Sequence, residues 1–147
     1  RLQFMYPKSF VLQDRLDRIL LTEGATDQWY SQNISVYIQK EPFDDDLLAA
    51  CKEWVARHLT HSTDVNFPNT QETKINSAKA VKLFYTAGEN GNDYGYQAPS
   101  GYVACIKHLT KSIIVSGISV ESDIVKTYFD YILHTVQFFS TPSEESI

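Results

Sequence analysis

The sequence contains few of the residues that cross-link or punctuate small proteins: two cysteines, five prolines and six glycines among 147 residues. Two cysteines are too few for a disulfide framework, so the domain must rely on a hydrophobic core. A chain of this length buries roughly two-thirds of the surface that its unfolded form exposes, which suffices for such a core. We therefore expect a single domain over residues 1–140 and a flexible polar tail over 141–147.

Positive charge and long apolar runs are also scarce. The formal net charge is −5, and the basic residues are scattered rather than gathered in a stripe. Nucleic acids and anionic membrane surfaces both attract clustered Lys and Arg, so neither is expected as the partner. No apolar stretch approaches the roughly 20 residues that cross a bilayer, so we expect no transmembrane segment. The chain begins at Arg1 rather than Met, so we expect a trimmed piece of a longer product, from which any signal peptide or lipid anchor would be missing.

Recognisable catalytic motifs are absent as well. The segment Ser116–Ser119 lacks the glycine pattern of a hydrolase nucleophile turn and falls within an expected strand. The glycines between Gly88 and Gly95 are not followed by Lys-Ser or Lys-Thr and lead to no helix, so they form no phosphate loop. We predict that the protein is not an enzyme and needs no cofactor. A hydrolase whose catalytic partners are remote in sequence is the competing hypothesis.

The two cysteines, Cys51 and Cys105, are far apart and show no spacing typical of metal ligands. The favoured interpretation is a pair of buried thiols that act as small hydrophobic residues. The alternative is a single disulfide, which would imply an exported protein.

Hydrophobic periodicity predicts an α+β fold. In Asn33–Gln39, Ile34, Val36 and Ile38 alternate with polar residues, which is typical of a strand. Further strands are expected over 2–6, 17–23, 73–75, 79–86, 102–108 and 112–119, and a loop over 61–70. Short connections between strands favour antiparallel pairing, and two amphipathic helices can cover such a sheet.

The first helix is expected from residue 47 to residue 59, where apolar residues recur at spacings of three and four. The acidic cluster Asp44–Asp46 precedes it and is explained by capping, since it lacks the alternation and the glycine of a calcium loop. A second helix is expected over 123–139, with Ile132, Val136 and Phe139 on one face.

Two groups of residues are candidates for binding. His58 and His61 lie three apart at the expected end of the first helix, which makes them weak metal-ligand candidates beside the simpler explanation that they favour the helix dipole. The segment 87–100 is expected to be an exposed hairpin loop that suits protein or glycan contacts. Its candidate contact residues are Glu89, Asn92, Asp93, Tyr94 and Tyr96.

Four segments of the sequence resemble the PsbP-like family, which includes the photosystem II protein PsbP, bacterial relatives and a Ran-binding nuclear-import factor. These segments are Phe4–Phe10, Ile34–Leu59, Ile75–Thr86 and Ile132–Phe139, and they occur in the family's order along nearly the whole chain. Bacterial relatives often have Gly after Ile-Asn, whereas Ser77 stands there in this chain. No binding residue of the family is carried over, because the family has no compact functional motif that this sequence repeats.

The resemblance implies an α/β/α sandwich with a central antiparallel sheet and helices on both faces. It also implies a non-catalytic accessory or protein-interaction role, in a bacterial protein that is exported or lipid-anchored. We accordingly expect a protein partner and an extracytoplasmic location, and the oligomeric state stays open. The alternative function is that of a carrier for a small ligand or a metal.

Overall fold

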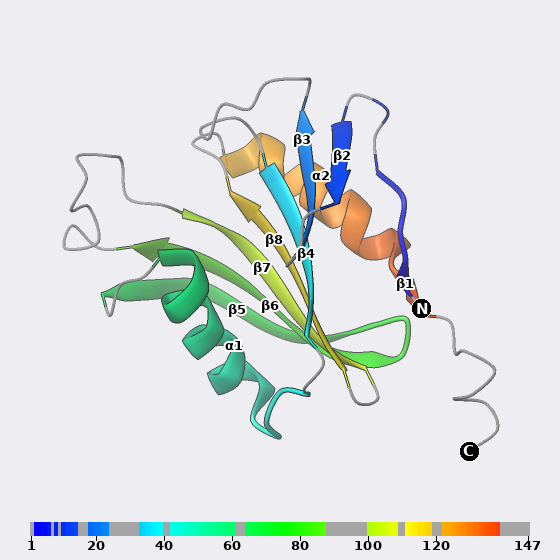
Figure 1. Ribbon diagram of the computed structural model, residues 1–147. Helices are drawn as coiled ribbons and strands as arrows, with labels where there is room; N and C mark the ends of the chain where they lie inside the picture. The colour runs from blue at the N-terminus through cyan, green and yellow to red at the C-terminus, as the bar shows by residue number, and fades with distance from the viewer. Residues whose placement is uncertain are drawn as a thin grey trace, which may run out of the picture.

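The computed structural model describes residues 2–6, 8, 10–14, 18–23, 33–39, 42–60, 64–87, 100–108, 111–118 and 122–138. A seven-stranded antiparallel sheet forms its centre (Figure 1). The order across the sheet is β2 (Phe10–Asp14), β3 (Arg18–Glu23), β4 (Asn33–Gln39), β8 (Lys111–Ile118), β7 (Ser100–His108), β6 (Ala78–Ala87) and β5 (Val65–Ile75). A separate pair joins β1 (Leu2–Gln3) to β9 (Gln137–Phe138) near the two ends of the chain.

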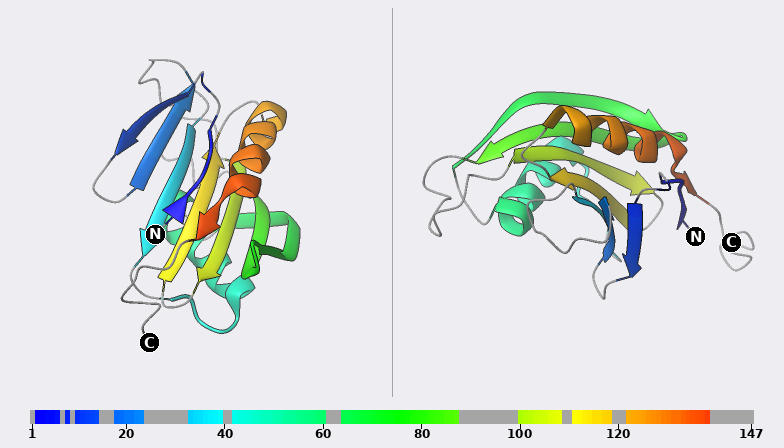
Figure 2. Two further views of the ribbon diagram at one scale, coloured as in Figure 1. Left: turned by 90° about the vertical axis from the view of Figure 1, so that its right-hand side faces the viewer. Right: turned by 90° about the horizontal axis from the view of Figure 1, so that it is seen from above.

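Two helices cover opposite faces of this sheet. Helix α1 (Leu47–Val55) packs mainly on β7 and β6, whereas α2 (Ser122–Thr135) packs mainly on β8, β7 and β4. The right-hand view of Figure 2 places the helices on opposite sides of β7 and β8. The α/β/α sandwich that the sequence resemblance implies is therefore confirmed.

Alternation along the strands divides the core into two clusters. On β8, Ile113 and Val115 belong to the cluster under α2, whereas Ile114 belongs to the cluster under α1. Phe129 and Ile132 of α2 fill the first cluster, and both are buried. Successive residues of a strand face opposite sides of the sheet, and a helix covers each side of the middle strands. These strands must therefore be apolar at nearly every position.

The predicted strand over 33–39 is confirmed, and the predicted ends of β6, β7 and β8 differ from the structure by at most two residues. The predicted loop over 61–70 is wrong for its described part, because residues 65–70 form the first half of β5. Pro68 is tolerated there because β5 is an outer strand and its register shifts between Asn66 and Asn69. Strand β2 was missed, since Val11 and Leu12 are both about two-fifths exposed and give no alternation.

Both helices are shorter than predicted. The first becomes a π-helical turn at Ala56–Thr60, and the second ends at Thr135 instead of Phe139. The chain leaves α2 at Val136 because Gln137 and Phe138 pair with Gln3 and Leu2. Within the described residues no helix is both long and apolar enough to span a membrane.

The start of α1 agrees with the capping prediction. The Asp46 side chain accepts a hydrogen bond from the Ala49 backbone N–H at 3.1 Å, which satisfies a donor that the helix itself cannot pair. Asp45 lies 3.3 Å from the Lys107 ammonium instead, in an ion pair whose carboxylate is fully exposed.

The favoured interpretation of the cysteines is wrong, because Cys51 and Cys105 form a disulfide with a Cα–Cα distance of 5.9 Å. Cys51 lies on the buried stripe of α1, and Cys105 lies on the face of β7 beneath that helix. The bond therefore ties α1 to the centre of the sheet. Sequence patterns place both residues inward but do not show which inward residues face each other.

Candidate functional site

A hollow of about 550 Å³ opens between α2 and the outer strands β5 and β6. A second hollow of about 350 Å³ continues it toward the C-terminal end of α2 and shares Gln71 and Lys82 with the first. The hollows exist because α2 packs mainly over the middle of the sheet and leaves the same side of β5 and β6 partly uncovered. We call the two hollows together the α2 groove. Its lining includes Asn69, Thr70, Gln71, Thr73, Lys82, Phe84, Tyr102, Lys126, Phe129, Asp130, Leu133 and His134.

Three aromatic rings line one part of the α2 groove. The centroids of Phe84 and Tyr102, which face each other across β6 and β7, are 4.9 Å apart, and Tyr102 lies 6.0 Å from Phe129 of α2. Phe129 is buried in the core, whereas Phe84 and Tyr102 are half-buried. Half-buried rings supply contact area with little conformational entropy to lose, which is favourable in a binding surface.

Polar and charged residues of α2 border the groove at a spacing of four. Lys126, Asp130 and His134 form this stripe, and the Asp130 carboxylate lies 3.1 Å from the Lys82 ammonium of β6. His134 Nδ1 lies 2.6 Å from the Asp130 backbone oxygen, so its ring is oriented by the helix. Since the one carboxylate of the lining is already paired, the described lining carries an excess of positive charge.

The tip of the β5–β6 hairpin closes one end of the groove. Asn76 and Ser77 have positive φ angles of 47° and 71°. The Asn76 amide donates a hydrogen bond to the Val136 backbone oxygen, which anchors the turn to the end of α2. Bacterial relatives of the resembling family often have Gly at the position of Ser77. The structure explains that preference, because the turn needs a positive φ there and Gly adopts it without strain.

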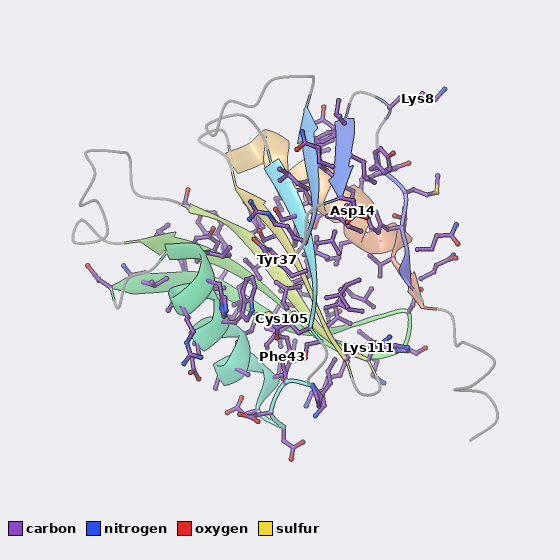
Figure 3. The ribbon with its side chains drawn as sticks, in the orientation of Figure 1. Lys8, Asp14, Tyr37, Phe43, Cys105 and Lys111 are labelled. Atoms are coloured by element: carbon purple, nitrogen blue, oxygen red, sulfur yellow. A yellow bond between two sulfur atoms is a disulfide. The ribbon has the colours of Figure 1, made fainter. Side chains whose placement is uncertain are left out.

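A smaller hollow of about 330 Å³ lies beside α1 and contains the metal-ligand candidate His58. The His58 ring stacks on Trp54 with a centroid distance of 4.7 Å, and Tyr37 meets the same Trp54 edge-on at 4.9 Å. Arg18 donates a hydrogen bond to the Tyr37 hydroxyl at 2.9 Å. Tyr37 packs against the core cluster under α1, to which Phe43 and Cys105 belong (all three are labelled in Figure 3). His58 is thus held by packing.

The structure brings no metal-binding set around His58. Its predicted partner His61 lies outside the described residues, and in the part of the chain that is described no three His, Cys, Asp or Glu side chains gather as a metal site. For the metal-carrier alternative, His58 is therefore the one candidate ligand that the described residues place, and the small-ligand alternative stays a prediction.

Two hydroxyl-bearing residues of the sheet, Ser116 and Tyr85, are poorly placed for nucleophilic catalysis. Ser116 is buried within β8 rather than exposed at a turn. Tyr85 is fully buried, and burial, with a smaller contribution from Tyr37, raises the pKa of its hydroxyl well above the ordinary value of 10.0. Tyr85 is therefore neutral at physiological pH, and among the described residues its oxygen has no hydrogen-bond partner.

The predicted contact residues Glu89, Asn92, Asp93, Tyr94 and Tyr96 lie outside the described residues. The two strands that flank them are described, and β6 ends at Ala87 while β7 begins at Ser100. The groove residues Phe84 and Tyr102 are a cross-strand pair close to these two ends. The predicted loop therefore connects the strands next to the aromatic part of the α2 groove.

Sequence reasoning missed the α2 groove, although part of its signal was present. The spacing of Lys126, Asp130 and His134 marks a polar stripe along the second helix. Nothing in the sequence shows that this stripe borders uncovered strands, because that depends on β5 and on the sheet order.

No protein-family model and no curated protein sequence matches the chain at a significant level. Solved structures do match it over most of its length. The Ran-binding protein Mog1p of Saccharomyces cerevisiae is 12% identical, with a TM-score of 0.71 over 92% of this chain and 89% of that one. Cyanobacterial PsbP from Synechocystis is 15% identical, with a TM-score of 0.65 over 94% and 86%. LpqN of Mycobacterium tuberculosis, involved in cell envelope biogenesis, is 11% identical, with a TM-score of 0.60 over 92% and 82%.

These likenesses establish the fold. The chain has the architecture shared by PsbP and Mog1p, as the sequence resemblance implied. At identities of 11–15% they carry no residue-level assignment, so the function must be argued from this chain's own surface.

Proposed function

We propose that this chain is a non-catalytic protein-interaction domain and that its partner binds in the α2 groove. The observation that carries the proposal is the groove itself: an open surface with half-buried aromatic rings and an excess of cations, on a protein whose net charge is −5. Aromatic contact area provides affinity. The positive charge of the groove, on a protein with a negative net charge, provides selectivity for the partner. The loop with Tyr94 and Tyr96 extends this surface in the proposal.

The structural neighbours support an interaction role. Mog1p is a Ran-binding protein that uses the same fold, and LpqN takes part in cell envelope biogenesis. Shared architecture at low identity does not transfer a partner. The shared fold does support a binding role for this domain, and the α2 groove is the surface on which the proposal rests.

We further propose that the domain is extracytoplasmic and belongs to an exported, lipid-anchored bacterial protein. The buried Cys51–Cys105 disulfide supports this location, because such bonds persist in oxidising compartments and are rare in the cytosol.

Site-specific photocrosslinking in the source cells tests the interaction role. A photoreactive amino acid at Gln71, which lines both hollows, is expected to give a discrete adduct with one protein. The same amino acid at Glu53, an exposed position on α1, serves as the control and should give none. Lys126→Glu and the double change Tyr94→Ala with Tyr96→Ala should each weaken the adduct. Equal adducts from Gln71 and Glu53, or no effect of Lys126→Glu, would contradict the proposal.

A further inference from the structure

Strand β5 ends the sheet, and in the described part of the chain no other strand pairs with its outer edge. Unpaired edges attract other chains, and proteins usually protect them with proline, bulges or charge. Here Pro68 and the register shift between Asn66 and Asn69 protect one end, and the turn at Asn76–Ser77 closes the other. The stretch from Asn69 to Ile75 keeps a regular register with β6, so it is an ordered edge without a bulge.

The hairpin fixes which backbone groups of this edge point outward. Ile75 and Ala78 flank a two-residue turn, and such a pair exchanges both of its hydrogen bonds. Because hydrogen-bonded and non-bonded pairs alternate in an antiparallel ladder, Thr73 and Gln71 also bond inward to β6. The N–H and C=O groups of Lys74, Glu72 and Thr70 therefore point away from the sheet.

The side chains at this edge are divided between the two faces of the sheet. Thr73 pairs with Ala80, which belongs to the core under α2, so the side chains of Thr73 and Gln71 lie on the α2 side. Glu72 pairs with Val81 of the core under α1, so its carboxylate lies on the other side. A strand added beside β5 would thus present every second side chain to the α2 groove.

The charge of the α2 groove selects the chemistry of those side chains. Lys82 from β6 and Lys126 and His134 from α2 line it, and the carboxylate of the described lining, Asp130, is already paired with Lys82. The Lys82 and Asp130 side chains are 27% and 32% exposed, so water screens this pair and an incoming carboxylate can compete for Lys82. Lys126 is exposed and shows no ion pair among the described residues.

We propose that the edge of β5 binds an extended, acidic segment of the partner protein as an additional antiparallel or parallel strand. Backbone groups of Thr70, Glu72 and Lys74 pair with the segment. Its alternate Asp or Glu side chains reach Lys82 and Lys126. This deepens the proposed function, on which it rests, by assigning the class of partner segment and its mode of binding.

Amide hydrogen exchange of the isotope-labelled domain with a short peptide of alternating glutamate and valine tests this. The peptide is expected to slow exchange at the outward amides of Thr70, Glu72 and Lys74, and to leave the inward amides of Gln71 and Thr73 unchanged. A peptide of alternating lysine and valine is the matched control and should not bind. No saturable change up to about 1 mM glutamate peptide, the affinity range of weak contacts, would overturn the proposal.

Variants separate the backbone contribution from the charge contribution. Glu72→Pro removes one outward N–H and should weaken binding about tenfold, whereas Glu72→Gln keeps the N–H and should bind as the wild type does. Lys82→Gln with Lys126→Gln should also weaken binding about tenfold and flatten its salt dependence, without altering the strand backbone. Equal affinity of both peptides, or full binding by this double variant, would overturn the assignment of an acidic segment.

The two proposals fail in different ways. If Gln71 gives its crosslinked partner but Glu72→Pro leaves the adduct unchanged and the glutamate peptide does not bind, the groove binds a protein by another mode. If Gln71 gives no partner at all, the proposed function itself is wrong.

Discussion

At the scale of single residues, two consecutive positive φ angles close the β5–β6 hairpin. A turn of this kind favours Asn followed by Gly, because the second residue needs the left-handed conformation that a Cβ disfavours. Asn76 satisfies the first position and also donates to the Val136 oxygen, whereas Ser77 adopts a φ of 71° with a side chain present. The strain falls at the tip that closes the α2 groove.

Ser77→Gly should therefore stabilise the domain. Relief of the left-handed strain is expected to raise the free energy of unfolding by about 1 kcal/mol, measured by urea denaturation. Asn76→Gly is the matched control, since it removes the hydrogen bond to Val136 and should lower stability. A stability for Ser77→Gly equal to or below that of the wild type would show that Ser77 is not strained.

Tyr85 provides a second test at this scale. Its raised pKa means that the folded state keeps the proton while the unfolded chain releases it near the ordinary value of 10.0. The unfolded state therefore binds fewer protons above that pH, and stability falls as pH rises. Tyr85→Phe should show a smaller fall between pH 9 and pH 11, the range around this ordinary value, in thermal melts. Because no residue in the described part of the chain bonds to the hydroxyl, the variant should be at least as stable as the wild type at pH 7. Identical pH profiles would contradict this.

At the scale of elements, strong periodicity predicted the middle of the sandwich well, and the outer elements poorly. Strand β4 alternates apolar and polar residues in sequence, and Ile34 and Val36 lie in the core under α2, so its bounds were predicted correctly even though Ile38 is exposed. Strand β5 is mostly exposed and contains Pro68, so it has the composition of a loop. Its strand conformation comes from pairing with β6, and single-sequence patterns do not contain that tertiary information.

The disulfide acts on an element rather than on one residue, because it fastens α1 to β7 across 54 positions of the sequence. Closing a loop of this size reduces the entropy of the unfolded chain and is expected to contribute about 3–4 kcal/mol. Reductant should therefore lower the denaturation midpoint of the wild type. It should leave the midpoint of the double variant Cys51→Ala with Cys105→Ala unchanged. The same midpoint for oxidised and reduced wild type would show that the bond adds no stability.

At the scale of the whole molecule, the order of elements and the resemblance were sufficient to predict the sandwich, and the likeness to PsbP and Mog1p confirms it. The candidate site was not predictable in the same way. The residues first favoured for binding, from Glu89 to Tyr96, come from composition alone and stay a prediction. The α2 groove arises because α2 is placed over the middle strands and leaves β5 and β6 open, which is a property of packing.

The measurement that tests the central claim most directly is calorimetric titration of the crosslinked partner, once identified, into three forms of the domain. The wild type and Arg57→Glu should bind equally. Arg57 is exposed in the π-helical turn after α1, on the other side of the sheet, and its replacement makes the same charge change as Lys126→Glu. Lys126→Glu should bind about tenfold or more weakly, since it places a carboxylate in the α2 groove. If Arg57→Glu lost affinity and Lys126→Glu did not, the binding surface would lie beside α1 and the account would be wrong.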